Sequence, residues 1–301
     1  MKPLVFALPG NEALALNLCR RLQAEPGQLQ VRRFPDGESY VRYANELSGR
    51  DVILVCTLDR PDEKVLPLYL AACIAKELGA KRVGLVLPYL AYMRQDARFN
   101  PGEGITSAHF ARLICSVADW MVTVDPHLHR HASLDEIYSI PSRVAHAAPA
   151  IAAWIREEVE NPVVIGPDSE SEQWAAEVAH AAGCPYTVLQ KIRRGDKDVD
   201  VSVPDPLLLQ GRTPVLVDDI VSTARTMAAA VGHLARLGTR APVCVAVHPI
   251  FADDALEVLQ RSGAGRIASC NTVLHASNAI DVAGQLELAI SAVPLHARPA
   301  D

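Results

Sequence analysis

Short apolar runs alternate with helical patterns along nearly the whole chain. Runs of strand length lie at Leu4–Leu8, Val52–Cys56, Val83–Leu87, Met121–Val124, Val163–Ile165, Val215–Val217, Val243–Val247 and Ile267–Val273. Alanine- and leucine-rich segments with helical spacing lie between them, for example Val65–Leu78, Ala108–Val117, Ser171–Ala182 and Thr226–Leu237. Because the strands are apolar on both faces, the alternation predicts an α/β fold with mainly parallel sheets flanked by helices.

Polar residues directly follow several of these strands. Asp125–His127, Gly166–Asp168 and Asp218–Asp219 each come straight after an apolar run. Ligands of open α/β sheets bind beyond the carboxyl ends of the strands, so a binding site is expected there. The pattern runs through both halves of the chain, which predicts two similar domains. The least regular connection lies at 139–142, and we therefore place the domains at residues 1–143 and 144–301.

The composition restricts the classes of function. A net charge of −6 argues against a general nucleic-acid binder, but a few local cations and Mg²⁺ still permit a phosphorylated substrate. The seven cysteines include no CxxC pair, and most lie in apolar runs, which is typical of a reduced compartment. The sequence shows no signal peptide and no apolar run of transmembrane length, so we expect a cytoplasmic protein without a membrane partner.

The stretch Val215–Thr226 carries the clearest chemical signal. An apolar strand leads into the adjacent carboxylates of Asp218 and Asp219, and a hydroxyl-rich turn then precedes a helix. Free N–H groups at a helix N-terminus suit a phosphate, and two carboxylates can accept hydrogen bonds from sugar hydroxyls. The stretch therefore predicts a pocket for a phosphorylated sugar. The alternative is an ordinary strand-to-helix junction with exposed acids.

This stretch resembles the ribose-phosphate loop shared by type I phosphoribosyltransferases and ribose-phosphate pyrophosphokinases. Further segments resemble pyrophosphokinase motifs in family order, and Asp125–His127 with Ser133–Tyr138 resembles archaeal-type members of that family. The resemblance implies two similar phosphoribosyltransferase-like domains. The first would be the nucleotide side, and the second would carry the ribose-phosphate loop.

The resemblance also implies which residues bind the nucleotide. In the family, a Phe-x-Asp-Gly-Glu element reaches the adenine of ATP from a neighbouring subunit, which implies a homo-oligomer, either a dimer or a multiple of dimers. A second element carries an Arg-Gln pair that binds the nucleotide, and Asp96 next to it is expected to support Arg94. The implied ATP-binding residues are Phe34, Asp36, Gly37, Glu38, Arg94 and Gln95.

The remaining matches concern the metal, the phosphates and the ribose. The resemblance implies Mg²⁺ as cofactor, with His127 and Asp168 as its contacts, and Lys191 and Arg193 as catalytic residues that stabilise charge on the transferring phosphates. The implied ligands of ribose 5-phosphate are Asp218, Asp219, Ser222, Thr223, Ala224, Arg225 and Thr226. Most members have glycine in place of Arg225. An arginine there could clash with the phosphate or add a cation beside it.

The implied reaction joins ATP and ribose 5-phosphate to give phosphoribosyl pyrophosphate and AMP. Two alternatives stay open. A phosphoribosyltransferase would share only the loop near Asp218 and would lack the elements at Phe34–Glu38 and Arg94–Gln95. A non-catalytic regulatory homologue would keep the fold but disrupt the metal residues or the loop that bears Lys191 and Arg193.

Overall fold

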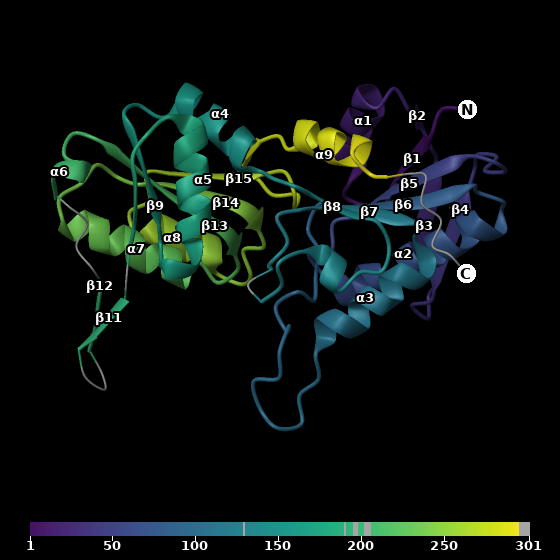
Figure 1. Cartoon of the computed structure of the whole chain (residues 1–301), viewed down its shortest axis with the longest axis horizontal. Coiled ribbons are helices and arrows are strands. Elements are labelled where there is room, and N and C mark those ends of the chain that lie inside the picture. The colour runs from purple at the N-terminus through teal and green to yellow at the C-terminus, as the bar shows by residue number, and fades with distance from the viewer. Residues whose placement is uncertain (129, 190, 195–197, 202–205, 295–301) are drawn as a thin grey trace. The chain divides into compact units, whose positions relative to one another are not determined.

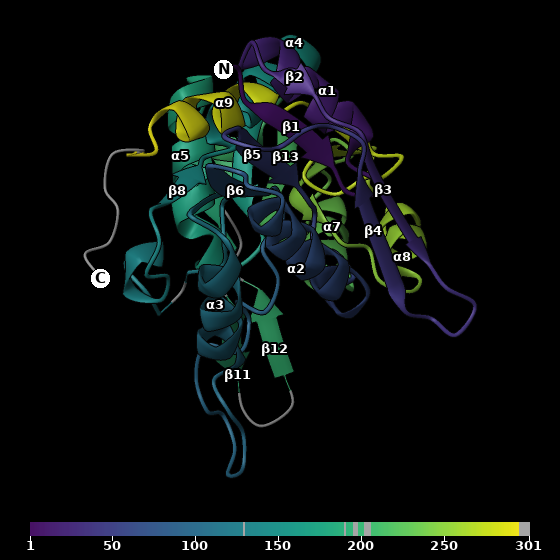
Figure 2. The same ribbon diagram turned by 90° about the vertical axis from the view of Figure 1, so that its right-hand side faces the viewer.

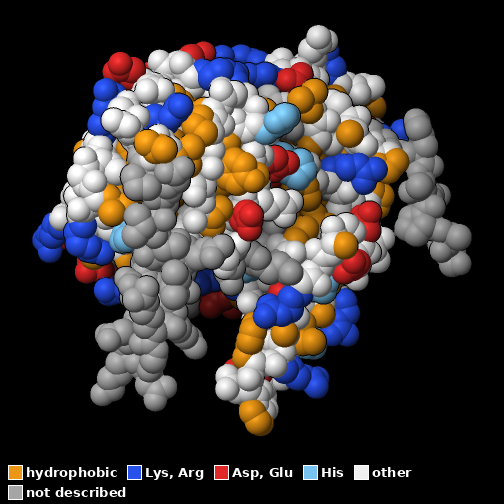
Figure 3. Space-filling model, turned by 60° about the vertical axis from the view of Figure 1, so that its left-hand side comes forward, with side chains coloured by type: hydrophobic (Ala, Val, Ile, Leu, Met, Phe, Trp, Pro, Cys, Tyr) orange, Lys and Arg blue, Asp and Glu red, His pale blue; other side chains and the backbone are white. Residues whose placement is uncertain are grey.

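Two six-stranded parallel sheets organise the chain. A computed structural model describes residues 1–128, 130–189, 191–194, 198–201 and 206–294. Contacts divide the chain into two units (Figure 1): the first holds Met1–Ala145 and the C-terminal helix α9 (Ala283–Ser291), and the second holds His146–Val282. On the face drawn in Figure 3, acidic and basic side chains are interspersed.

The sheet of the first unit has the strand order β2-β1-β5-β6-β7-β8, with every neighbouring pair parallel. Its strands are β1 (Leu4–Ala7), β2 (Glu25–Pro26), β5 (Asp51–Val55), β6 (Arg82–Leu87), β7 (Trp120–Val124) and β8 (Ser142–Ala145). An antiparallel hairpin of β3 (Leu29–Arg33) and β4 (Ser39–Tyr43) lies between the second and third strands along the chain. The central strands form the core because their side chains are buried on both faces.

The helices of the first unit are α1 (Glu12–Arg21), α2 (Pro61–Glu77), α3 (Thr106–Val117), the short 3₁₀ helix η1 (Leu134–Glu136) and α9. Helix α9 returns from the far end of the sequence to pack on α1, β7 and β8, and Arg21 pairs with Glu287 at 3.3 Å. Close packing also requires a glycine at position 84. A Cβ atom at Gly84 would come within 2.0 Å of the Trp120 ring on the neighbouring strand, so no larger residue fits.

The second unit repeats this plan. Its sheet order is β10-β9-β13-β14-β15-β16, again parallel throughout. The strands are β9 (Pro162–Gly166), β10 (Tyr186–Val188), β13 (Thr213–Val221), β14 (Val243–Pro249), β15 (Arg266–Cys270) and β16 (Asn278–Ile280). A second antiparallel hairpin, β11 (Lys191–Arg194) with β12 (Asp198–Val201), again lies between the second and third strands.

The helices of the second unit are α4 (Ala148–Glu158), the 3₁₀ helix η2 (Ser169–Ser171), α5 (Glu172–Ala182), α6 (Pro206–Leu209), α7 (Arg225–Arg236) and α8 (Ala255–Arg261). Apolar residues of α7 pack with β9, β13 and β14 into one core cluster that includes Met227, Val231 and Leu234. Among the described residues, no helix combines the length and apolar character needed to span a membrane.

The predicted fold class is confirmed: the chain is an α/β protein with two mainly parallel sheets flanked by helices. Two details differ from the sequence-based expectation. Strand β13 continues through Asp218 and Asp219 to Val221, so the two carboxylates lie within the strand. The proposed division into 1–143 and 144–301 assigns α9 to the second half, whereas its contacts are with α1, β7 and β8.

Candidate active site

The segment after β6 presents Arg94 at the carboxyl edge of the first sheet. Tyr92 has a left-handed backbone (φ 60°) and donates a hydrogen bond to Asp62, and burial together with this bond raises the pKa of Tyr92 to about 12. Three residues later, the side-chain oxygen of Gln95 accepts from the Thr106 hydroxyl at the start of α3. These two anchors hold the segment, and the Arg94 side chain between them is exposed.

Asp96 joins this segment to the loop after β7. Its side chain is only 2% exposed and pairs with Arg130 at 2.8 Å, and the Arg130 guanidinium lies 5.2 Å from the centroid of the Phe99 ring. The expectation that Asp96 supports Arg94 is therefore wrong, because the carboxylate is directed to the next loop. A buried carboxylate that loses its hydrogen-bond partner lowers the stability of the folded protein. The pair of Asp96 and Arg130 therefore holds the two loops together.

The loop after β7 carries His127. It begins at Asp125, a buried residue with φ 33°, whose N–H donates to the Ala145 carbonyl at 3.2 Å. A positive φ in a buried non-glycine residue is strained and persists only where surrounding contacts hold it. His127 follows as a half-buried side chain at the same edge of the sheet as Arg94.

Phe34–Glu38 form the turn of the β3–β4 hairpin. The Phe34 N–H donates to the Glu38 carbonyl at 2.8 Å, and the Gly37 N–H donates to the Phe34 carbonyl at 2.9 Å. Gly37 has φ 96°, a conformation that glycine adopts without strain. All five side-chain positions of the turn are exposed, and Figure 2 shows the turn projecting away from the sheet. Phe34, Asp36 and Glu38 are thus exposed and not buried in the core of the unit.

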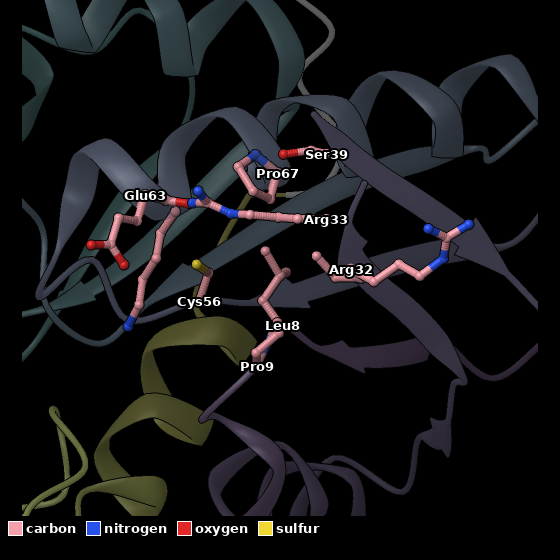
Figure 4. A pocket seen from close by; sticks show the side chains of 10 residues that line it. Leu8, Pro9, Arg32, Arg33, Ser39, Cys56, Glu63 and Pro67 are labelled. Atoms are coloured by element: carbon pink, nitrogen blue, oxygen red, sulfur yellow. The ribbon is translucent and has the colours of Figure 1, made fainter. Parts of the chain in front are cut away.

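A pocket of about 240 Å³ lies beneath the base of this hairpin (Figure 4). Its lining comes from the ends of β1 and β5, from the hairpin and from the first turns of α2. The strands β1 and β5 flank the point where the strand order reverses, which is where open α/β sheets bind ligands. None of the sequence-predicted site residues lines this pocket.

In the second unit, Asp168 lies in a turn directly after β9. Ser171 closes this turn: its hydroxyl donates to the Asp168 carbonyl at 2.6 Å and accepts from the Asp168 N–H at 3.2 Å. Ser171 packs so closely that a Cβ atom at Gly166 would approach its Oγ to 2.7 Å. The sequence Ser169–Ser171 therefore builds a defined turn that leaves the Asp168 side chain half-exposed.

The neighbouring strand β13 carries Asp218 and Asp219, both half-buried. The chain then turns at Ala224, which has a left-handed backbone (φ 58°), and α7 begins at Arg225. The first N–H groups of a helix have no partner within it, and Ala224 has no side-chain atom that could accept from them. Ser222, Thr223 and Thr226 are hydroxyl residues in this turn and at the start of α7, and the Arg225 side chain is exposed.

Backbone hydrogen bonds fix this turn against the segment after β14. The N–H groups of Phe251 and Ala252 donate to the carbonyls of Val221 and Ser222 at 2.9 and 3.0 Å. Phe251 has φ 37°, a genuine outlier for a bulky residue. The buried His248 lies just before it, with its Nδ1 3.0 Å from the Thr272 hydroxyl. The sequence marks His248 as a polar residue at the end of an apolar strand. Nothing in the sequence marks Phe251, because only the pairing of β13 with β14 brings it beside Val221.

Lys191 and Arg193 lie on β11, whose backbone pairs with β12. Their side chains lie outside the described part of the structure. Within each unit, the structure gathers the predicted residues at strand ends or on the inserted hairpin. In the first unit Arg94, Gln95 and His127 follow the adjacent strands β6 and β7, and in the second unit Asp168, Asp218 and Asp219 lie on or after the adjacent strands β9 and β13.

Comparison with known proteins decides the family. The family model of the N-terminal domain of ribose phosphate pyrophosphokinase matches residues 4–117, and that of the phosphoribosyl transferase domain matches residues 133–283. A ribose-phosphate pyrophosphokinase of Methanopyrus kandleri is 34% identical over 93% of this chain and 96% of its own length. The chain belongs to the ribose-phosphate pyrophosphokinase family.

Other family members give the same picture. The ribose-phosphate pyrophosphokinase of Halobacterium salinarum is 32% identical over 91% of this chain and 95% of its own length. The crystal structure of phosphoribosylpyrophosphate synthetase from Mycobacterium smegmatis aligns with a TM-score of 0.83 at 26% identity, over 97% of this chain and 98% of that chain. The predicted resemblance to this family, and to its archaeal members, is confirmed, as is the prediction of an enzyme.

The predicted Mg²⁺ contacts, His127 and Asp168, stay a prediction. Among the described residues, no group of three or more His, Cys, Asp or Glu side chains is assembled as a ready cation site. Mg²⁺ commonly uses one or two carboxylates, with waters and substrate phosphates completing its shell. The half-exposed carboxylate of Asp168 suits that mode of binding.

Proposed function

We propose that the chain transfers a pyrophosphate group from MgATP to the anomeric hydroxyl of ribose 5-phosphate, giving phosphoribosyl pyrophosphate and AMP. The observation that carries this proposal is the acid pair on β13 followed by a left-handed turn and the free first amides of α7. Carboxylates beside an amide cradle offer acceptors for sugar hydroxyls and donors for a phosphate, the two ends of a pentose phosphate.

Each group of this cradle has a distinct part in the proposal. Asp218 and Asp219 accept hydrogen bonds from the ribose hydroxyls. The amides at the start of α7 donate to the 5-phosphate, with the hydroxyls of Ser222, Thr223 and Thr226 around it. Because the exposed Arg225 side chain stands at the first helical position, it adds a cation near the phosphate without filling the turn.

The nucleotide would be bound by residues of the first unit. Arg94 is exposed and held between two anchored neighbours, which suits a cation that meets a phosphate or a base. Gln95 accepts from Thr106, so its side-chain amide nitrogen is the group left to donate to the nucleotide. Phe34 would stack on the adenine, while Asp36 and Glu38 accept from its amino group and Gly37 forms the turn.

Charge on the phosphates is met by the metal and by cations of the second hairpin. Mg²⁺ would be held by Asp168 and His127 and would neutralise charge on the phosphoryl oxygens. Lys191 and Arg193 would donate to those oxygens as charge develops on them. Positioning and electrostatics then supply most of the rate, because phosphoryl transfer requires little covalent participation by the protein.

We also propose a homo-oligomer, a dimer or a multiple of dimers, in the cytoplasm. Support comes from the turn at Phe34–Glu38, which projects away from its sheet in Figure 2 and whose aromatic and acidic residues are exposed. A turn of this kind can complete the site of a neighbouring copy.

Incubation of the purified protein with ribose 5-phosphate and MgATP tests the reaction. AMP and phosphoribosyl pyrophosphate should form in equal amounts, and chelation of Mg²⁺ should stop both. Lys191→Ala should lower kcat by about 10²–10³ while nucleotide binding persists. Arg261→Ala, which removes an exposed ion pair with Glu257 on α8, is the matched control and should turn over normally. Absence of AMP at every concentration of added inorganic phosphate would indicate the non-catalytic regulatory homologue. Consumption of phosphoribosyl pyrophosphate with a nucleobase would instead indicate a phosphoribosyltransferase.

A further inference from the structure

One arginine on the β3–β4 hairpin, Arg32, contacts two aromatic rings. The Arg32 guanidinium carbon lies 4.6 Å from the centroid of the Phe34 ring and 4.1 Å from that of the Tyr40 ring. The two rings meet edge to face, with centroids 5.8 Å apart and planes at 90°. Each of these three contacts has a favourable geometry, one as an edge-to-face aromatic pair and two as cation–π contacts.

The strand register explains why these three side chains meet. Arg32 lies directly opposite Tyr40 in the antiparallel pair, and Phe34 lies two residues beyond Arg32 on the same face. The other face of the hairpin is used differently, since Val31, Arg33 and Ser39 line the pocket beneath it. Figure 4 shows Arg33 directed toward Glu63, whose carbonyl it contacts at 3.4 Å. Arg32 also belongs to the pocket lining, but its guanidinium extends in the opposite direction.

Phe34 has no core to fix its orientation. It is 39% exposed at the end of the hairpin, where a single aromatic side chain would sample several rotamers in water. The Arg32 guanidinium lies against one face of its ring, and the Tyr40 ring restrains it from the side. One part of the ring stays accessible while its rotamer is restricted before any ligand binds, which lowers the entropy cost of stacking.

We propose that Arg32 and Tyr40 are positioning residues that hold the Phe34 ring ready to stack on the purine base of the nucleotide. The inference rests on the proposed function, in which Phe34 meets the adenine. Neither residue needs to touch the nucleotide, because each acts through Phe34.

Steady-state kinetics of the full-length enzyme test this inference. Arg32→Ala should raise the KM for ATP about two- to five-fold, while kcat and the KM for ribose 5-phosphate stay unchanged. Arg32→Lys keeps a cation over the ring and should recover part of the loss. Arg42→Ala is the matched control, because it removes an exposed arginine of β4 that stacks on neither ring, and it should leave all three constants unchanged.

A double-mutant cycle separates this inference from the proposed function. In the Phe34→Ala background, Arg32→Ala should have no further effect on the KM for ATP. An equal effect in both backgrounds would mean that Arg32 binds ATP directly, and the inference would be overturned. A raised KM in Phe34→Ala but a normal one in Arg32→Ala would overturn the inference alone. A normal KM in Phe34→Ala would overturn both the adenine role of Phe34 and the inference, whereas AMP formation by the wild-type enzyme would still stand.

Discussion

The two units share one scaffold and differ in how the third strand leads into its helix. Both sheets have the same order when their strands are numbered along the chain, and both carry an antiparallel hairpin between the second and third strands. Strand β5 of the first unit therefore corresponds to β13 of the second. The hairpin with Phe34–Glu38 corresponds to the hairpin with Lys191 and Arg193.

At the end of β5, the backbone donors are already used. The Thr57 N–H donates to the Asn11 side chain at 2.9 Å, and the Leu58 N–H donates to the Tyr89 carbonyl at 3.1 Å. Helix α2 then starts with Pro61, which has no N–H to offer. In the second unit, acids extend β13, and α7 starts after a left-handed alanine with its first amides free. The end of the third strand therefore borders an apolar pocket in the first unit, whereas in the second unit it offers donors that suit an anion. The chemistry is set by the turn and not by the sheet.

Removing one charge from the acid pair should give the largest difference between the units. Asp219→Asn and Asp218→Asn should each raise the KM for ribose 5-phosphate about 10- to 100-fold, because a hydrogen bond to a charged acceptor is lost. Asp59→Asn, which removes the carboxylate after β5 that pairs with Lys64, should leave that KM unchanged. Initial rates at varied ribose 5-phosphate concentrations give the KM of each of the three variants. A shift of similar size in the Asp59 variant would end the distinction between the two turns.

The units also differ in how neighbouring loops are joined. The first unit uses the side-chain pair of Asp96 and Arg130, whereas the second uses backbone bonds from Phe251 and Ala252. Arg130→Ala leaves a carboxylate that is 2% exposed without its partner and should cost about 1–3 kcal/mol in urea unfolding. Arg261→Ala, from an exposed pair, should change stability by less than about 0.5 kcal/mol. Equal effects of the two variants would show that the Asp96 pair does not hold the loops.

The left-handed alanine gives a third way to separate the units. Ala224→Val should cost about 1–2 kcal/mol, because a β-branched residue fits poorly at φ 58°. Ala224→Gly should be close to neutral, since glycine adopts this conformation freely. Arg60 caps α2 with φ −129°, so Arg60→Val should also be tolerated. Thermal unfolding of the three variants, with the KM for ribose 5-phosphate, checks the ranking. A tolerated valine at 224 would show that the turn can relax.

The N-terminal ends of the strands should differ between the two units in a small, pH-dependent contribution to stability. Arg82 hydrogen-bonds to Asp51 across β5 and β6 and lowers the pKa of that carboxyl, whereas β13 and β14 pair Val215 with Val243. The ion pair therefore stabilises the first unit at neutral pH, and this contribution is lost as the pH falls below about 4. Asp51→Asn should cost less than about 1 kcal/mol at pH 7, because the pair is partly exposed, and the difference from wild type should shrink in acid. A difference that is the same at pH 7 and pH 3 would exclude the ion pair as its cause.

The sequence was sufficient for the scaffold but less so for the site. Apolar runs located the buried strands to within a few residues, since both faces of β5, β6 and β14 are covered. The edge strands β2 and β16 are short and partly exposed, so no periodicity marks them. The sequence does not predict the extension of β13 through Asp218 and Asp219, because carboxylates are poor strand formers and only pairing with β14 keeps them extended.

Motif resemblance identifies the candidate site residues, but the residues that hold them in place are visible only in the structure. The positions of Arg94, His127 and Asp168 at strand ends follow from strand-to-loop order. The pairing of Asp96 with Arg130 joins residues 34 positions apart, and the contact of Arg32 with Tyr40 depends on hairpin register. Neither leaves a signal in sequence spacing. The metal contacts and the homo-oligomer stay predictions.

The return of α9 to the first unit has a consequence for biosynthesis. The second unit is inserted between Ala145 and Ala283, so its residues are made as one continuous block. The first unit therefore lacks α9 until the whole second unit has been synthesised, and α1, β7 and β8 are incompletely covered up to that point. The unit whose synthesis begins first is thus completed only after the second unit has been made.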